Sequence, residues 1–69
     1  MSNYNAAKAF IDFNIGLINT SNSRQVADDA FTWTKSDLLD YIDSGYINQA
    51  EHGLLLELLT TAYSNRGSV

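Results

Sequence analysis

The sequence contains no cysteine and no proline in its 69 residues, and only four glycines. Without cysteine the chain can form neither a disulfide nor a zinc site with thiolate ligands. Without proline, only glycine and clusters of serine and asparagine interrupt a helix. No apolar run approaches the ~18 residues of a membrane span, and no basic segment precedes an apolar one at the N-terminus. We therefore expect a cytoplasmic protein with no membrane association.

Basic residues are also scarce, since four Lys or Arg stand against eight Asp or Glu and give a formal net charge of -4. Negative charge repels phosphate backbones, so the composition disfavours direct nucleic-acid binding. The same charge suits a protein partner with a basic surface, although it also suits simple solubility.

The length limits the core that the chain can build. A domain of this size buries only ~60% of the surface that its unfolded chain exposes, and its core rarely contributes more than about 3–5 kcal/mol of net stability. Since disulfides are excluded, association with another chain is the common remaining support. We expect a single helical domain over residues 1–69 that acts as an oligomer, in the simplest case a homodimer.

Apolar residues recur at helical spacing from about Asn3 to Asn19, which predicts a first helix. This segment carries two apolar stripes, one of Tyr4, Ala7, Ile11, Ile15 and Ile18 and another of Ala6, Phe10, Phe13 and Leu17. Between Ile11 and Leu17 apolar and polar residues also alternate, as in a half-buried strand, so a strand stays open as an alternative. We favour the helix because a lone strand pairing is marginal in water.

The Ser- and Asn-rich segment 19–23 predicts a loop, because these side chains hydrogen-bond their own backbone. Asn22 or Ser23 then caps a short second helix. Thr34 with Asp37 three residues later predicts the start of a third helix as a variant capping box, and Trp33 is placed to pack on the new helix as a hydrophobic staple.

Gly45 fits the left-handed position just past the end of the third helix. Asn48 and Glu51 form a second capping box that opens a fourth helix, which runs to about Tyr63 or Ser64. The predicted fold is all-α, a small bundle of three or four short helices that ends in an αα-hairpin.

The predicted fourth helix has more apolar surface than one core needs. Its leucines, together with Ala62 and Tyr63, cover roughly 200° of its circumference, about twice the arc that a helix buries on a single core. Large exposed apolar patches mark interaction sites. We therefore expect the oligomer interface at Leu56, Leu59, Tyr63 and His52, with Gly53 where another helix comes close.

His52 is the only histidine, and no cysteine or second histidine accompanies it. A lone histidine defines neither a nucleophilic triad nor a zinc site. A domain this small also has little room for an active-site pocket. We expect no enzyme activity, no metal and no cofactor.

Acidic residues recur every three positions at Asp37, Asp40 and Asp43. They share one side of the predicted third helix, beside Tyr41 and Tyr46, and tyrosine is enriched among residues that dominate binding interfaces. We predict that these five residues bind a protein partner. The competing interpretation is an ordinary solvated helix face.

The segment DYIDSGYINQAE, residues 40–51, resembles an EF-hand calcium loop. Position one is Asp40, five is Ser44, six is Gly45, eight is Ile47 and twelve is Glu51. The resemblance implies calcium binding between two helices. The sequence departs from the family pattern at position three, where Ile42 replaces an oxygen ligand.

The last two predicted helices, joined by a glycine-containing turn, also fit a helix-turn-helix nucleic-acid-binding motif. However, no Lys or Arg occurs between Asn48 and Asn65, where such a motif would contact phosphates. The sequence therefore favours a small acidic protein that binds or inhibits another protein, like the regulators by which phages and mobile elements act on host machinery or immunity. A degenerate EF-hand-like hairpin and a helix-turn-helix protein are the alternatives.

Overall fold

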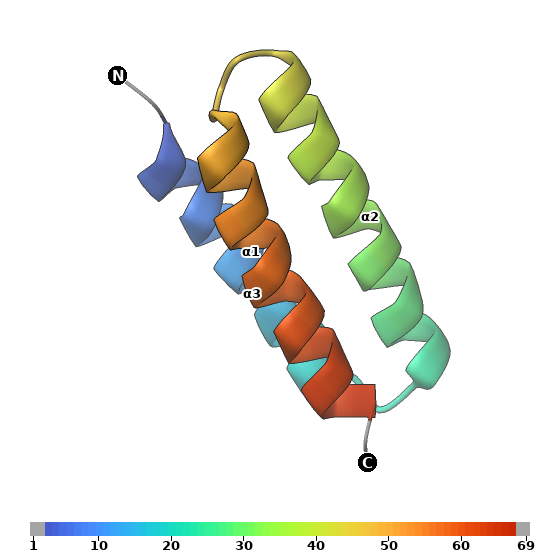
Figure 1. Ribbon diagram of the computed structural model, residues 1–69. Coiled ribbons are helices and arrows are strands. Elements are labelled where there is room, and N and C mark those ends of the chain that lie inside the picture. The colour runs from blue at the N-terminus through green and yellow to red at the C-terminus, as the bar shows by residue number, and fades with distance from the viewer. Residues whose placement is uncertain (1–2, 68–69) are drawn as a thin grey trace.

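Three α-helices make up nearly all of the computed structural model, which describes residues 3–67 and the side chains as far as Asn65. The helices are α1 (Tyr4–Thr20), α2 (Arg24–Asp43) and α3 (Gln49–Gly67), and each packs against the other two (Figure 1). The bundle measures 38 × 16 × 15 Å. The all-α prediction is confirmed, and the first segment is a helix rather than a strand.

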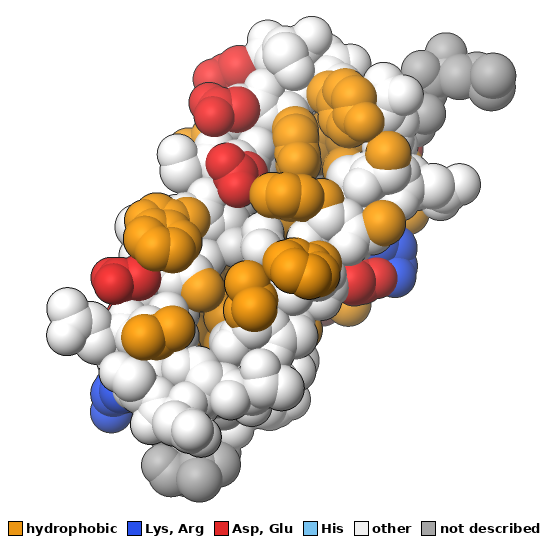
Figure 2. Space-filling view, turned by 180° about the vertical axis from the view of Figure 1, so that it is seen from behind, with side chains coloured by type: hydrophobic (Ala, Val, Ile, Leu, Met, Phe, Trp, Pro, Cys, Tyr) orange, Lys and Arg blue, Asp and Glu red, His pale blue; other side chains and the backbone are white. Residues whose placement is uncertain are grey.

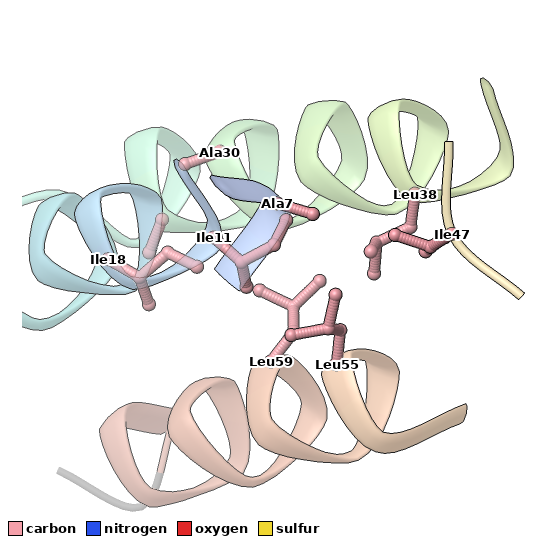
Figure 3. Close-up of a cluster of buried hydrophobic side chains, with 9 residues drawn as sticks. Ala7, Ile11, Ile18, Ala30, Leu38, Ile47, Leu55 and Leu59 are labelled. Atoms are coloured by element: carbon pink, nitrogen blue, oxygen red, sulfur yellow. The ribbon is translucent and has the colours of Figure 1, made fainter. Parts of the chain in front are cut away.

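The core is a column of apolar side chains contributed by all three helices and by the segment between α2 and α3 (Figure 3). Its members are Ala7, Ile11, Ile18, Ala27, Ala30, Leu38, Ile47, Leu55 and Leu59. On α1 the buried side chains belong to the first of the two apolar stripes, with Tyr4 and Ile15 packed against the core at its edge. The second stripe of α1 faces away from the core.

The predicted helix start at Thr34 is wrong, because α2 continues through this position without a break. Thr34 is buried, and its Oγ1 donates a hydrogen bond of 2.6 Å to the backbone oxygen of Ala30 one turn earlier. A threonine that bonds backwards in this way sits inside a helix rather than at its start. Trp33 is 67% exposed and is therefore no staple on the fully buried Leu38. The actual cap is Ser23, whose Oγ accepts the N–H of Val26 at 3.4 Å.

The end of α2 is a Schellman motif, in which two backbone bonds close the last turn. The N–H of Tyr46 donates to the oxygen of Tyr41 at 2.9 Å, and the N–H of Gly45 donates to that of Ile42 at 3.1 Å. Gly45 has φ 78°, which a residue with a Cβ adopts only at a cost. The left-handed position predicted for Gly45 is confirmed.

The predicted capping box at the start of α3 is also confirmed. The N–H of Glu51 donates to Asn48 Oδ1 at 2.8 Å, and the N–H of Asn48 donates to Glu51 Oε1 at 3.0 Å. This reciprocal pair satisfies backbone donors that the first turn would otherwise leave open. The same segment is tied to the N-terminal end of α1, because the N–H of Asn3 donates to the oxygen of Tyr46 at 3.0 Å.

No helix in the described part of the chain combines the length and the apolar character needed to cross a lipid bilayer.

Candidate functional site

Part of the exposed surface of α1 is an apolar strip. Phe10, Phe13 and Leu17 follow one another at spacings of three and four residues, so they are neighbours on the helix surface. Phe13 is 66% exposed, and Phe10 and Leu17 are exposed as well. This strip belongs to the second apolar stripe of the sequence, and it stays on the surface because the first stripe fills the core.

Helix α2 continues this apolar surface across a groove. Val26 and Trp33 of α2 face Phe10 and Leu17 of α1, and the groove between the helices has a volume of about 440 Å³ with Ala30 on its lining. Figure 2 shows hydrophobic side chains gathered along the middle of the side of the bundle seen from behind. Of the eight exposed large hydrophobic residues in the described part of the chain, five lie here.

A row of carboxylates borders this surface on α2. Asp29, Trp33 and Asp37 lie at successive positions i, i+4 and i+8, and Asp40 follows three residues further on. Asp29 and Asp40 are exposed, and Asp37 lines the groove itself. The indole of Trp33 therefore sits between acidic groups along one edge of the apolar surface. We call this surface the α1–α2 face, made of Phe10, Phe13, Leu17, Val26, Trp33, Asp29, Asp37 and Asp40.

The basic side chains of the described residues lie elsewhere. Lys8 Nζ pairs with Asp12 Oδ2 at 2.8 Å, and this hydrogen bond and charge raise the pKa of Lys8 above its ordinary value. Lys35 Nζ lies 4.6 Å from the ring centroid of Phe31. Arg24 is nine residues before Trp33, which places it on the opposite side of α2. In Figure 2 the Lys and Arg side chains appear only at the margins of the view. Among the side chains described as far as Asn65, the ion pair is that of Lys8 with Asp12, and it lies off the carboxylate row.

The structure divides the five residues predicted to bind a partner. Asp37 and Asp40 belong to the α1–α2 face, whereas Asp43 is exposed at the last position of α2. Tyr41 and Tyr46 are half-buried, with ring centroids 5.2 Å apart, so they close the helix end rather than stand free as anchors.

Tyr41 connects this helix end to the face, because its ring meets that of Phe10 edge to face at a centroid distance of 6.2 Å. Burial raises the pKa of Tyr41, and the negative charges of Asp37 and of Tyr46 when ionised add to the effect. The phenol is therefore neutral at physiological pH and offers no charge to a partner.

The sequence analysis missed most of the apolar members of the α1–α2 face. Trp33 was assigned to a helix start that does not exist. The second stripe of α1 was the signal that could have revealed this surface, because Phe10, Phe13 and Leu17 lie on a different side of α1 from its first stripe.

The predicted oligomer interface needs correction at Leu59, which is fully buried within the bundle and offers no area to a second chain. Leu56 and Tyr63 are half-buried against the same core, and His52 is also half-buried. Tyr63 stacks on Phe31 with ring centroids 4.3 Å apart, and its hydroxyl donates a hydrogen bond to Asp28. This side of α3 packs inward because α2 covers it.

A second groove, with a volume of about 710 Å³, lies between α1 and α3. The exposed leucines Leu54 and Leu58 line it, together with the acidic side chains of Asp12 and Glu57. The space is larger than that of the first groove, but it gathers only two exposed large hydrophobic residues. Gly53 lies on α3 with open space around the position of a Cβ, so neither α1 nor α2 makes the close approach that the sequence suggests for another helix.

The segment that resembles an EF-hand is accounted for by helix ends. Asp40–Asp43 forms the last turn of α2, and Glu51 lies in the first turn of α3 with its carboxylate bonded to the N–H of Asn48. Among the described residues, no three or more Asp, Glu, His or Cys side chains are grouped closely enough to hold a metal ion. The geometry of residues 40–51 is that of a turn between two helices rather than that of a calcium-binding loop.

A helix-turn-helix motif brings its two helices together at about 90–120°. Helices α2 and α3 instead lie side by side along most of their length and run in opposite directions (Figure 1). The absence of Lys and Arg from Gln49 to Asn65 adds an electrostatic argument against insertion of α3 into a DNA groove.

No protein-family model, no curated protein and no solved structure matches this chain, so its own geometry carries the functional argument.

Proposed function

We propose that this protein is a non-catalytic binding domain that docks on another protein through the α1–α2 face. The observation that carries the proposal is the concentration of five exposed large hydrophobic side chains on one side of a 69-residue chain. Contiguous apolar surface of this kind marks interaction sites on small soluble proteins.

The residue types on this face also support a binding role. Trp33 and Phe13 expose about two thirds of their surface, and aromatic side chains are enriched in the centres of protein interfaces. Trp33 in particular is a residue type that dominates binding energies when a partner encloses it. A face built only for solubility would place charged side chains at these positions instead.

In this proposal the rest of the bundle is a scaffold. Helices α2 and α3 act as an αα-hairpin whose buried side chains hold α1 in place, so the face is presented by a pre-formed surface. The inhibitory role, the origin in a phage or mobile element, the cytoplasmic location and the homodimer stay predictions from the sequence.

The test compares two double variants in affinity capture from the organism that encodes the protein. Phe13→Ser with Trp33→Gln removes two exposed apolar groups from the face, and Leu54→Ser with Leu58→Ser removes two from the other groove. Circular dichroism first establishes that both variants are helical.

We expect the same partner to be captured by the wild type and by the Leu54/Leu58 variant, and to be lost with the Phe13/Trp33 variant. Equal capture by both variants, or no protein captured by the wild type, would contradict the proposal.

A further inference from the structure

We propose that the segment bound by the α1–α2 face is a cationic amphipathic helix of a partner protein. This inference rests on the proposed function and adds the chemistry of the partner. It is argued from the shape of the groove, the placement of the carboxylates and the charge balance of the face.

The shape of the site favours a helix. Two helices, α1 and α2, bound a groove of about 440 Å³ with apolar residues on both walls. An amphipathic helix lies in such a groove with its apolar side chains at spacings of three and four residues. Phe10 and Leu17 on one wall and Val26 and Trp33 on the other repeat at a spacing of seven residues, two helical turns, which matches such a ligand along its length.

The acidic groups favour positive charge along one flank of that helix. Asp29, Asp37 and Asp40 occupy the α2 edge, whereas the α1 edge is formed by Phe10, Phe13 and Leu17 without a charged group. From Asp29 to Asp40 the row extends over ~16 Å of helix axis, about three helical turns. A helix seated in the groove thus meets apolar surface on one side and carboxylates on the other. Lysine or arginine side chains at intervals of one turn would reach them.

The charge balance also argues against a second copy of this chain as the occupant. The described Lys and Arg side chains lie off the face, with Lys8 held by Asp12 and Lys35 over Phe31. A second copy that offered the same face would bring only like charges to the carboxylate row, and like-charge juxtaposition across an interface disfavours association. A basic partner supplies the opposite sign.

The fluorescence emission of Trp33 reports binding, because Trp33 is the only tryptophan of the chain and is 67% exposed on the α1–α2 face. The probes are two tryptophan-free synthetic peptides of about 18 residues, each ~27 Å long as a helix. Both carry leucine at spacings of three and four residues, and they differ only in having lysine or glutamate along one flank. We expect the lysine peptide to shift the Trp33 emission to shorter wavelength and the glutamate peptide to leave it unchanged at the same concentration.

Two double variants test the carboxylates with the same change in net charge. Asp29→Asn with Asp40→Asn neutralises the row at exposed positions, and Asp12→Asn with Glu57→Gln neutralises exposed groups off the face. Exposed ion pairs each alter affinity by about 1.4- to 5-fold, so the first variant should weaken the lysine peptide by roughly 2- to 30-fold at low salt. The second should change its affinity less than twofold.

The outcomes separate this inference from the proposed function. If both peptides bind equally, or if the two double variants weaken the lysine peptide equally, the cationic partner is refuted while the apolar docking face stands. If neither peptide shifts the Trp33 emission, the helical ligand is refuted, and the capture experiment with the Phe13/Trp33 variant still decides the proposed function independently.

Discussion

Substituting the adjacent leucines of α3 separates core from surface in one experiment. Leu59 is fully buried, whereas Leu58 is 41% exposed at the edge of the α1–α3 groove. We predict that Leu59→Ala destabilises the fold far more than Leu58→Ala. The pair is matched because both changes remove the same atoms from neighbouring positions of one helix.

The expected sizes follow from burial. Replacing a fully buried leucine by alanine costs about 2–5 kcal/mol, because a cavity adds to the lost transfer energy. Leu58 loses only part of the transfer energy of its side chain and water fills the space, so its replacement should cost ~1 kcal/mol. The whole domain is expected to have only about 3–5 kcal/mol of stability. Leu59→Ala should therefore remove most of the stability of the fold, and at the upper end of its cost it leaves the chain unfolded at 25 °C.

Urea unfolding followed by circular dichroism measures both costs. With a slope of about 1 kcal/mol per molar urea, as expected for a small domain, Leu58→Ala lowers the midpoint by ~1 M. Leu59→Ala lowers it by ~2 M or abolishes the transition. Sedimentation of the two variants completes the test, because an interfacial Leu59 would yield a folded monomer on substitution. Equal midpoints, or a well-folded Leu59→Ala chain of lower mass than the wild type, would refute the placement of Leu59 in the core.

Three further predictions concern the helix ends and one tyrosine. Gly45→Ala should destabilise the fold by about 1 kcal/mol because φ at this position is positive. Gly53→Ala, inside α3 with open space around it, should stabilise the fold by up to ~1 kcal/mol. Thermal unfolding measures both changes, and midpoints that shift in the same direction would contradict this prediction. Asn48→Ala should cost ~1 kcal/mol by breaking the capping box, while Gln49→Ala, its neighbour, should be nearly neutral in the same urea titration. Because burial raises the pKa of Tyr41 above 10.0 in the folded state, the unfolded chain loses this proton first as pH rises. The contribution of Tyr41 to stability should therefore be constant below about pH 10 and be lost above it. Tyr41→Phe should reduce that alkaline loss, and an identical alkaline profile for this variant would contradict the assignment.

Features that depend on a few consecutive residues could be predicted from the sequence. The Asn48–Glu51 capping box involves partners three residues apart, and the left-handed turn at Gly45 needs a residue without a Cβ. The first stripe of α1, with Ile11 and Ile18, was likewise visible from periodicity alone. The capping box and the turn are local interactions, and the period of the stripe is a local pattern, so the identity of the neighbouring helices does not alter them.

The errors arose where a local signal competed with burial. The Thr34 capping motif is worth ~1 kcal/mol as a helix start. Continuing the helix instead buries Ala27, Ala30, Thr34 and Leu38 as one stripe at spacings of three and four residues, and no glycine or proline opposes it. The tertiary contacts of this stripe outweigh the cap. The resulting long helix carries Trp33 to the surface, between Asp29 and Asp37, which the sequence analysis did not anticipate.

The sequence by itself determined that this protein is helical and where two of its helix ends lie. It also determined that the chain has more apolar surface than a small core can bury. Only the tertiary structure decided which apolar stripe is hidden, because α1 and α3 each have two candidate sides and burial depends on where the other helices lie. Packing buried Leu59 and left Phe10, Phe13, Leu17, Val26 and Trp33 exposed. That choice removed Leu59 from the predicted oligomer interface and placed five exposed apolar residues beside Asp37 and Asp40 of the predicted partner site, since a side chain already enclosed by its own bundle has no area left for a partner.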